Sequence, residues 1–438
     1  MVDTAEALPE KRLFIELITR DITLEDAVLD LIDNSINSIL VKHEVNLANI
    51  FDDVLAGRYD FSAFERYAID IEIDSTAFSL TDNCGGISYD AAKHQVFHFG
   101  RPRGPSRGDT LSVYGIGLKR ALFKLGDAIK VRSRKDQQFE VAFSAREWEG
   151  KEAWVLPLET PSNGGLDEGQ TMVSVTDLHP DVVQRVGSAE FYASLAERVR
   201  QTYCFFLERF CVLTINGETM RREALEMGSE ASLKPSVQIV DENGVNTIVV
   251  AGLAPRNQWR AETAGWYIFC NGRAVLFADR SDRTGWGKGL PQYVSKFRGF
   301  RGIVFFFSED PENLPWDTTK TRINAEAIAF QRAQSLMYNT ARPVVAYLSS
   351  LYSTDEVESA PARTAADSVH AEPITRVISL GASTFSPPTR RKATTVNIQF
   401  SALISDVERV RTHLRNPTLS ARKIAEMALK YYLENEIA

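Results

Sequence analysis

The stretch from Leu24 to Leu40 constrains the fold most, because it predicts one helix whose two sides have opposite chemistry. Successive residues of a helix are turned by about 100°. This turn places five apolar side chains on one side: Val28, Leu31, Ile32, Ile36 and Ile39. The opposite side carries two carboxylates and two amides within a narrow arc: Asp30, Asp33, Asn34 and Asn37. Such a polar face is unusual to leave to solvent alone, and it marks a candidate site.

Length and composition predict a cytoplasmic protein of two or three domains. The chain has 438 residues, more than one hydrophobic core usually organises, with 44% hydrophobic and 25% charged residues. No apolar run approaches the roughly 18 residues of a membrane span, and Met1 to Leu13 lacks the apolar stretch of a signal peptide. The four cysteines show no C-x-x-C spacing, which predicts reduced thiols and neither a zinc knuckle nor a disulfide framework.

Alternating segments predict strands on either side of a long connection. Ile69, Ile71 and Ile73 alternate with acidic residues, and Phe78 to Thr81 is the expected hairpin partner, ended by Asp82. The Gly-, Pro- and Arg-rich segment 100–107 predicts a long mobile connection before a helix at 118–125, and a lid is one interpretation of it. Another alternating strand is expected at 171–178.

Composition divides the rest of the chain. A helix at 191–211 is expected to lead into a second α+β domain, with strands at 266–275 and 302–307 and a helix at 324–348. Residues 353–394 are rich in Ala, Ser, Thr and Pro, which predicts a flexible linker. The predicted divisions are therefore 1–187, 188–352, a linker at 353–394, and a small strand-helix-helix module at 395–438.

Two glycines and a lysine form a candidate phosphate site. Gly115 and Gly117 stand at a predicted helix start, followed by Lys119. Glycines let backbone N–H groups approach a phosphate closely, and a helix N-terminus favours an anion. Taken alone, a G-x-G at a helix start is more often a tight turn than a phosphate cradle.

The order and spacing of four segments resemble the GHKL superfamily of ATPases, which includes gyrase B, the ninety-kilodalton heat-shock chaperones, MutL and the MORC proteins. The resemblance covers residues 19–178. Asp30 to Ser35 resembles the N box, Asp82 to Ile87 the adenine-binding G1 box, Tyr114 to Lys119 the G2 box, and Thr171 to Leu178 the strand that closes the site. It implies a Bergerat-type α/β sandwich, in which helices cover one face of a mixed, mostly antiparallel sheet.

The resemblance also implies ATP and Mg²⁺ as cofactors and assigns roles to residues. Asp82 would accept the adenine amino hydrogen, with Thr171 reaching the same group. Asn34 would supply an oxygen to Mg²⁺, which takes few protein ligands when phosphates are present. Asp30, one helical turn before Asn34, would be the general base. Gly86, Gly115, Gly117 and Lys119 complete the predicted nucleotide site.

Three positions depart from the family pattern. Asp30 stands where Glu is usual, and its shorter side chain predicts slow hydrolysis. Cys84 stands where the G1 turn commonly has Gly, so only Gly86 carries over, and Asn37 stands where Asp is frequent.

The second domain resembles the transducer domain of MutL and MORC relatives. Residues 269–273 resemble its strand-turn, and residues 315–320 resemble its lysine loop. By this resemblance Lys320 would reach the γ-phosphate and make domain closure depend on ATP. A lone lysine in a loop would otherwise be an ordinary surface residue.

The last 45 residues resemble a ribbon-helix-helix module. An alternating strand that includes Val396, Ile398 and Phe400 precedes helices expected at 405–414 and 420–434. The resemblance implies a homodimer whose ribbon enters a DNA major groove, with Thr395, Asn397 and Gln399 facing the bases. From Arg390 to Ala438 nine basic residues face five acidic ones, although the whole chain has a net charge of −8. The alternative is a helical hairpin that only dimerises.

These features together predict a homodimeric, ATP-hydrolysing clamp or switch acting on double-stranded DNA, in repair or in defence against foreign DNA by analogy. Two alternatives remain open: a DNA-binding regulator that senses ATP with little hydrolysis, and a chaperone-like remodeller of proteins. A sensor histidine kinase fits poorly, because only 29 residues precede Asp30 and none is a histidine.

Overall fold

The computed structural model describes residues 10–100, 111, 115–161, 165–352, 356–387, 398–399 and 401–437. The chain forms two compact units, one ending at Arg390 and one comprising residues 391–438. Among the described residues, no helix is long and apolar enough to cross a membrane.

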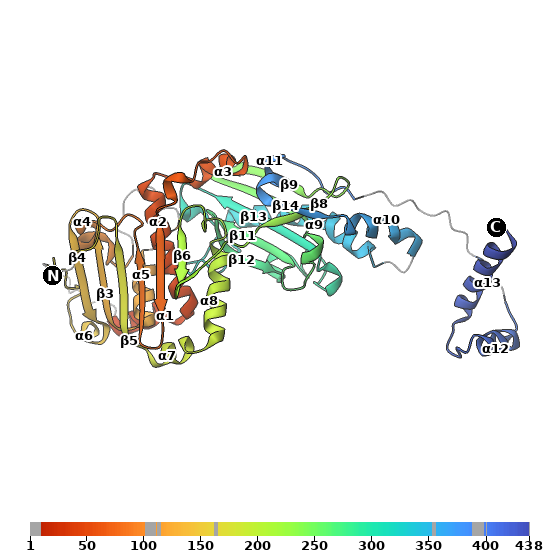
Figure 1. The fold of residues 1–438 in the computed structure, drawn as a ribbon, viewed down its shortest axis with the longest axis horizontal. Helices are drawn as coiled ribbons and strands as arrows, with labels where there is room; N and C mark the ends of the chain where they lie inside the picture. Colours follow the sequence, from red (N-terminus) through yellow and green to blue (C-terminus); the bar gives the residue numbers. More distant parts are fainter. Residues whose placement is uncertain are drawn as a thin grey trace, which may run out of the picture. The chain divides into compact units, whose positions relative to one another are not determined.

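The first unit begins with a seven-stranded sheet in the order β4-β3-β5-β2-β1-β6-β7 (Figure 1). Neighbouring strands are antiparallel, except that β1 and β6 run parallel. The strands are β1 (Ala68–Ile73), β2 (Ala77–Asp82), β3 (Gly126–Arg134), β4 (Gln138–Ser144), β5 (Thr171–Leu178), β6 (Val212–Ile215) and β7 (Glu218–Thr219). The mixed, mostly antiparallel sheet that was predicted is therefore confirmed.

Helices cover one face of this sheet (Figure 1). Exposed and buried side chains alternate along β1, as expected when one face packs on helices and the other meets solvent. The helices and helical turns of this part are α1 (Lys11–Arg20), α2 (Leu24–Lys42), α3 (Leu47–Leu55), η1 (Ser62–Phe64), α4 (Tyr89–Ala91), η2 (Ala92–Val96), α5 (Gly117–Leu125), α6 (Ala145–Glu149), α7 (Pro180–Val186) and α8 (Ala189–Thr202).

Helix α2 has a strong start signal in its sequence. The Thr23 hydroxyl accepts a hydrogen bond from the Asp26 amide, and the Asp26 carboxylate accepts one from the Thr23 amide, which forms a capping box. The apolar side of α2 lies in the core, with Val28, Ile32 and Ile36 fully buried. The helix is thereby fixed against the sheet, and its polar side is held in one orientation.

The helix expected at 191–211 is shorter than predicted. It ends at Thr202, and the aromatic run that follows is buried in turns between α8 and β6. The reason is a tertiary contact: the Tyr203 hydroxyl donates to the Leu29 carbonyl and to Asp33, at 2.8 and 2.7 Å. Strands β6 and β7 then extend the first sheet to Thr219, so the chain leaves this sheet well after the predicted boundary at residue 187.

The second part of the unit has its own seven-stranded sheet, in the order β12-β11-β13-β10-β8-β14 with β9 paired to β10. Helix α9 packs on β10 and β13. The elements are β8 (Glu226–Ser229), β9 (Ser236–Glu242), β10 (Val245–Leu253), η3 (Arg256–Gln258), β11 (Gly265–Cys270), β12 (Arg273–Asp279), η4 (Asp282–Thr284), η5 (Ser295–Phe297), β13 (Phe300–Phe307), η6 (Pro311–Asn313), α9 (Ile328–Ser350), α10 (Glu356–Asp367), β14 (His370–Pro373) and α11 (Ile374–Ser379).

The strand predicted at 266–275 is a hairpin of β11 and β12. Its two turn residues, Asn271 and Gly272, have φ values of 44° and 77°. Positive φ at both central positions is the requirement of a tight hairpin turn, and Asn-Gly is its preferred sequence. A Cβ on Gly272 would lie 2.8 Å from the Phe205 ring, so this turn also fits closely against the first part.

Residues 356–387 correct the prediction of a flexible linker at 353–394. Strand β14 pairs antiparallel with β8 at the edge of the second sheet, and helices α10 and α11 flank it. Ile374, Val377 and Ile378 of α11 are buried. A composition rich in small residues suggested a linker, but a few apolar side chains are enough to dock this segment on the sheet edge.

One hydrophobic core runs through both parts of the first unit. Phe51 of α3 joins them, because its ring centroid lies 4.2 Å from that of Phe307 and 5.4 Å from that of Phe305. The two predicted domains are therefore packed together through a shared apolar interior.

The second unit contains α12 (Ile404–His413) and α13 (Ala421–Glu436), close to the predicted helices. The strand predicted before them, with Thr395, Val396, Asn397 and Phe400, lies mostly outside the described residues.

Candidate functional site

The end of β2 holds a buried carboxylate beside β5. Asp82 is 6% exposed and pairs in register with Thr171 across the antiparallel β2–β5 ladder. The Ser35 hydroxyl donates to Asp82 at 2.7 Å, and the Cys84 amide donates at 2.9 Å. Asp82 and Thr171, which are both expected to contact the adenine amino group, are therefore cross-strand neighbours.

Burial raises the pKa of Asp82 to about 6, although its hydrogen bonds with Cys84 and Ser35 oppose the shift. No cation pairs with this carboxylate among the described residues. A buried acceptor of this kind suits a neutral donor such as an amino group, because the donor satisfies the acceptor without adding charge.

Thr171 belongs to a small hydroxyl network. Its Oγ1 lies 2.9 Å from Oγ of Ser133, and Ser133 accepts a hydrogen bond from the Ile87 amide at 2.8 Å. Ser35 and Ser133 were not predicted as site residues. Ser35 lies one position after Asn34, but nothing in the sequence shows that its hydroxyl points to Asp82.

Gly86 occupies a turn that admits only glycine. Its φ is +67°, and a Cβ there would lie 2.4 Å from the Arg134 carbonyl oxygen. The neighbouring Gly85 amide donates to the Gly169 carbonyl at 2.9 Å. The turn after Asp82 is thus pressed against the loop before β5, which fixes the position of Asp82.

The predicted phosphate segment lies against the polar face of α2. Gly115 has a φ of +64°, and a Cβ on Gly117, the first residue of α5, would lie 3.4 Å from the Asp30 carboxylate. Lys119 points elsewhere, because its ammonium group donates to the Val96 carbonyl at 2.9 Å. Burial lowers the pKa of Lys119 to about 8.

The polar face of α2 separates into groups with different partners. Asn34 is half-buried, and in the described part of the chain its side-chain amide makes no hydrogen bond. Asn37 accepts a hydrogen bond from the Leu111 amide at 3.1 Å. The amide oxygen of Asn34 is therefore available as a ligand.

Asp30 is held by Arg120 of α5. Both carboxylate oxygens of Asp30 accept hydrogen bonds from the Arg120 guanidinium, one of them at 2.8 Å from Nη2. The third nitrogen, Nη1, donates to the Thr318 carbonyl at 3.0 Å. Arg120 thus joins the predicted general base to the predicted lysine loop, a role that the sequence did not indicate.

Asp33 is the centre of a second buried cluster. Its carboxylate accepts hydrogen bonds from Tyr203 at 2.7 Å, from Arg273 Nε at 2.8 and 3.1 Å, and from Lys320 Nζ at 2.8 Å. Arg273 Nη1 also donates to the Lys320 carbonyl at 2.6 Å. The structure therefore brings Lys320 to α2 and pairs it with Asp33.

The other predicted site residues, those expected to read DNA, belong to the second unit. Thr395 and Asn397 lie outside the described residues, and Gln399 is exposed in the second unit. Among the described residues, no group of three or more His, Cys, Asp or Glu side chains could hold a metal ion.

The comparison with known families agrees with this geometry. Residues 22–172 match the sequence model of the family described as histidine kinase-, DNA gyrase B- and HSP90-like ATPase. The matched segment contains α2, the turn after Asp82 and the start of α5, and it ends at β5. The match supports the GHKL superfamily for this domain and indicates ATP binding. No curated protein matches the chain.

Proposed function

We propose that the first unit binds ATP with Mg²⁺ and hydrolyses it slowly. The observation that carries the proposal is the pair at the strand ends, where the buried Asp82 carboxylate and Thr171 are adjacent across the ladder. The adenine amino group would donate to Asp82, and Thr171 would take part directly or through water. The α5 N-terminus, with Gly115 and Gly117, would receive the phosphates.

The donor set fits Mg²⁺. The Asn34 amide oxygen makes no hydrogen bond within the described residues, and a hard cation that keeps several waters needs little more than one such oxygen and the phosphates. When bound, the ion would neutralise phosphate charge. Asp30, one helical turn before Asn34, would orient the attacking water and accept its proton.

Asp82→Asn tests the adenine site. The substituted amide would present a donor to the adenine amino group, and the mismatch should weaken ATP binding about 10- to 100-fold. Asp127→Asn is a matched control, because Asp127 is 7% exposed and also accepts hydrogen bonds from a serine hydroxyl and a backbone amide. Calorimetric titration with ATP compares the two variants, and equal affinities in both would refute the site.

Asp30→Ala tests hydrolysis separately from binding. Removing a general base should reduce phosphate release by about 10²–10⁴-fold while nucleotide still binds. Unchanged turnover in this variant would move the base elsewhere, and Glu25 would be tested next. Wild-type protein that binds ATP without turnover would favour the alternative of an ATP-sensing regulator.

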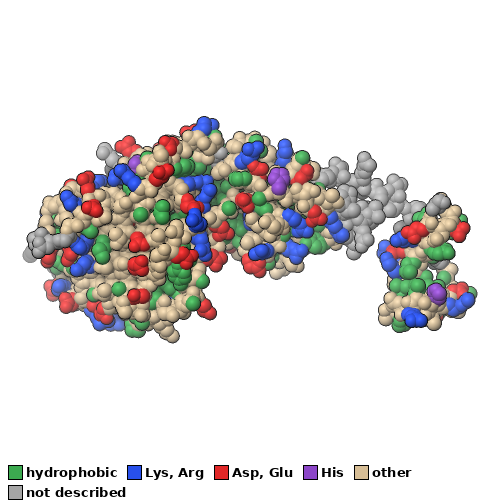
Figure 2. All heavy atoms as spheres, in the orientation of Figure 1, with side chains coloured by type: hydrophobic (Ala, Val, Ile, Leu, Met, Phe, Trp, Pro, Cys, Tyr) green, Lys and Arg blue, Asp and Glu red, His purple; other side chains and the backbone are tan. Residues whose placement is uncertain are grey.

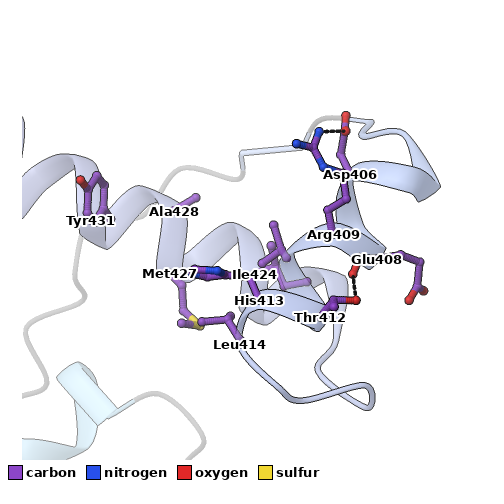
Figure 3. Close-up of a pocket in the computed structure, with 11 residues that line it drawn as sticks. Asp406, Glu408, Arg409, Thr412, His413, Leu414, Ile424, Met427, Ala428 and Tyr431 are labelled. Atoms are coloured by element: carbon purple, nitrogen blue, oxygen red, sulfur yellow. Dashed lines mark hydrogen bonds and ion pairs between the residues drawn. The ribbon is translucent and has the colours of Figure 1, made fainter.

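We propose that the second unit pairs two chains. None of the residues in α12 or α13 is buried. Apolar side chains gather on this unit, and a groove of about 970 Å³ lies between its helices, lined by Leu414, Met427, Tyr431 and others (Figures 2 and 3). A unit of this size rarely folds alone, and a second copy would cover the same apolar side chains symmetrically.

Removal of residues 396–438 tests this assembly. The truncated chain should be monomeric without nucleotide and should dimerise only with a non-hydrolysable ATP analogue, whereas the full chain should be dimeric in both conditions. Light scattering on both forms decides the matter, and a truncated chain that stays dimeric without nucleotide would refute the assignment.

We further propose double-stranded DNA as the client, with Thr395, Asn397 and Gln399 reading bases. The support is the local excess of basic residues from Arg390 to Ala438. ATP turnover should rise when duplex DNA is added. Turnover that responds to an unfolded protein but not to DNA would favour the chaperone-like alternative.

A further inference from the structure

Two buried clusters link α2 to the loop that carries Lys320. In the first, Arg120 bridges Asp30 and the Thr318 carbonyl, and in the second, Asp33 binds Lys320. All four charged side chains are at least 93% buried. The loop is therefore attached at two points, two residues apart, to the helix that bears the predicted general base.

The clusters together contain more positive than negative charge. Three cations, Arg120, Arg273 and Lys320, face the two carboxylates of Asp30 and Asp33. Tyr203 does not change the balance, because burial and the nearby Asp33 raise its pKa well above the ordinary value. A buried region with one excess cation attracts an anion, since low-dielectric surroundings strengthen the interaction.

The arrangement also occupies the catalytic groups. Both oxygens of Asp30 accept hydrogen bonds from Arg120, and the side chain is only 2% exposed, so the ion pair and its burial leave little room for a water molecule. The Lys320 ammonium group is likewise engaged by Asp33. In this arrangement Asp30 and Lys320 are both held in ion pairs, and these contacts must rearrange before either side chain can act in hydrolysis.

We propose that Arg120 senses the terminal phosphate of ATP. The γ-phosphate competes with Asp30 for the guanidinium, which frees the carboxylate to act as a base and breaks the contact with Thr318, so that the lysine loop keeps only its attachment through Lys320 and Asp33. ADP lacks this phosphate and leaves Arg120 on Asp30. The proposal rests on the ATP binding proposed above and adds a residue that couples phosphate recognition to base activation.

Arg120→Gln separates this role from a structural one. Loss of a charged contact to the γ-phosphate should weaken binding of a non-hydrolysable ATP analogue about 10- to 100-fold. ADP affinity should stay within about threefold, because ADP does not use the contact. Arg185→Gln is the matched control: Arg185 also binds both oxygens of a carboxylate on α2, that of Glu25, and should change neither affinity.

The outcomes distinguish this proposal from the proposed function. Wild-type protein that binds neither ADP nor the analogue would refute the ATP site itself. Wild-type protein that binds both, with an Arg120→Gln variant that weakens both equally or neither, would refute only the sensor. If Arg120→Gln does not fold, Arg120→Lys retains the charge without the two-nitrogen fork and should show the same selective loss.

Hydrogen exchange on the wild-type chain provides a test that needs no variant. The Lys320 amide donates to the Asp317 carbonyl at 3.1 Å, so its exchange reports on the loop. The analogue should change the exchange rate of residues 317–320, and ADP should leave it as in the nucleotide-free chain. Equal exchange with ADP and with the analogue would overturn the proposal.

Discussion

Asp33→Asn should destabilise the first unit more than any other single charge removal on α2. Asp33 is fully buried, and three side chains donate to it: Tyr203, Arg273 and Lys320. An asparagine keeps the size of the side chain but leaves two buried cations without a counter-charge. Breaking a buried ion pair by removing one partner costs about 3–5 kcal/mol.

Glu25→Gln gives the matched comparison on the same helix. Glu25 is 3% exposed, but the side chain of its partner Arg185 is 50% exposed, so water can solvate that cation when the pair is lost. Its removal should cost about 0–1 kcal/mol. Urea unfolding followed by circular dichroism measures both variants against the wild type. Free energies of unfolding that agree within 1 kcal/mol would refute the reasoning from burial.

The pH dependence gives a second measure of the same cluster. Burial alone would raise the pKa of Asp33, but Arg273 and Lys320 outweigh it and hold the pKa below its ordinary value. A carboxyl with a lowered folded-state pKa stabilises the fold above its unfolded pKa of about 3.9 and loses this contribution as the pH falls through the folded pKa. The stability difference between wild type and Asp33→Asn should therefore shrink as the pH drops below about 4.

Three further predictions concern the nucleotide site. Burial raises the pKa of Asp82 to about 6, and adenine recognition needs the ionised form, so ATP affinity should fall as the pH drops through 6. An ATP affinity that does not change between pH 5 and pH 7 would contradict the assignment. Burial lowers the pKa of Lys119 to about 8, and its ammonium group donates to the Val96 carbonyl, so ATP binding at pH 8 should leave its protonation unchanged. Binding enthalpies should then be equal in Tris and phosphate buffers, and unequal enthalpies would contradict this placement of Lys119. Gly86→Ala should reduce both stability and ATP affinity, because the new Cβ would lie 2.4 Å from the Arg134 carbonyl oxygen. Gly57 has the same φ of +67° but no atom within 4 Å of the added Cβ, so Gly57→Ala should cost only about 1–2 kcal/mol of stability. Equal unfolding midpoints in the two variants would argue against the close contact at Gly86.

The features that the sequence predicted best are those in which residues of one chemical type stand at a fixed spacing. The polar face of α2, the turn after Asp82 and the strand at Thr171 were predicted from residue order, and the structure places Asp82 beside Thr171. Period-2 alternation also located β1, β2 and β5 to within a residue or two. These features are local, so a short window of sequence contains the information that determines them.

Long-range partners could not be predicted. Arg120 follows Lys119 directly, and the sequence alone made the lysine the better phosphate ligand; the structure turns Lys119 toward the Val96 carbonyl and Arg120 toward Asp30. Asp33 meets residues 170, 240 and 287 positions away. The same limit applies to β14, whose pairing with β8 depends on a distant sheet edge.

The shared core of the first unit limits how this molecule can respond to a ligand. Moving the two sheets apart would uncover Phe51, Phe305 and Phe307, and each buried phenyl ring contributes about 1.5–3 kcal/mol through the hydrophobic effect. A single ligand contact contributes no more free energy than the burial of one such ring. A wide swing of one sheet against the other, which would expose all three rings, is therefore too costly. The sheets should instead behave as a rigid frame, and a signal should leave the site through displacement of the short loop 317–322, whose residues are all polar or charged and lie between the buried Trp316 and Ile323.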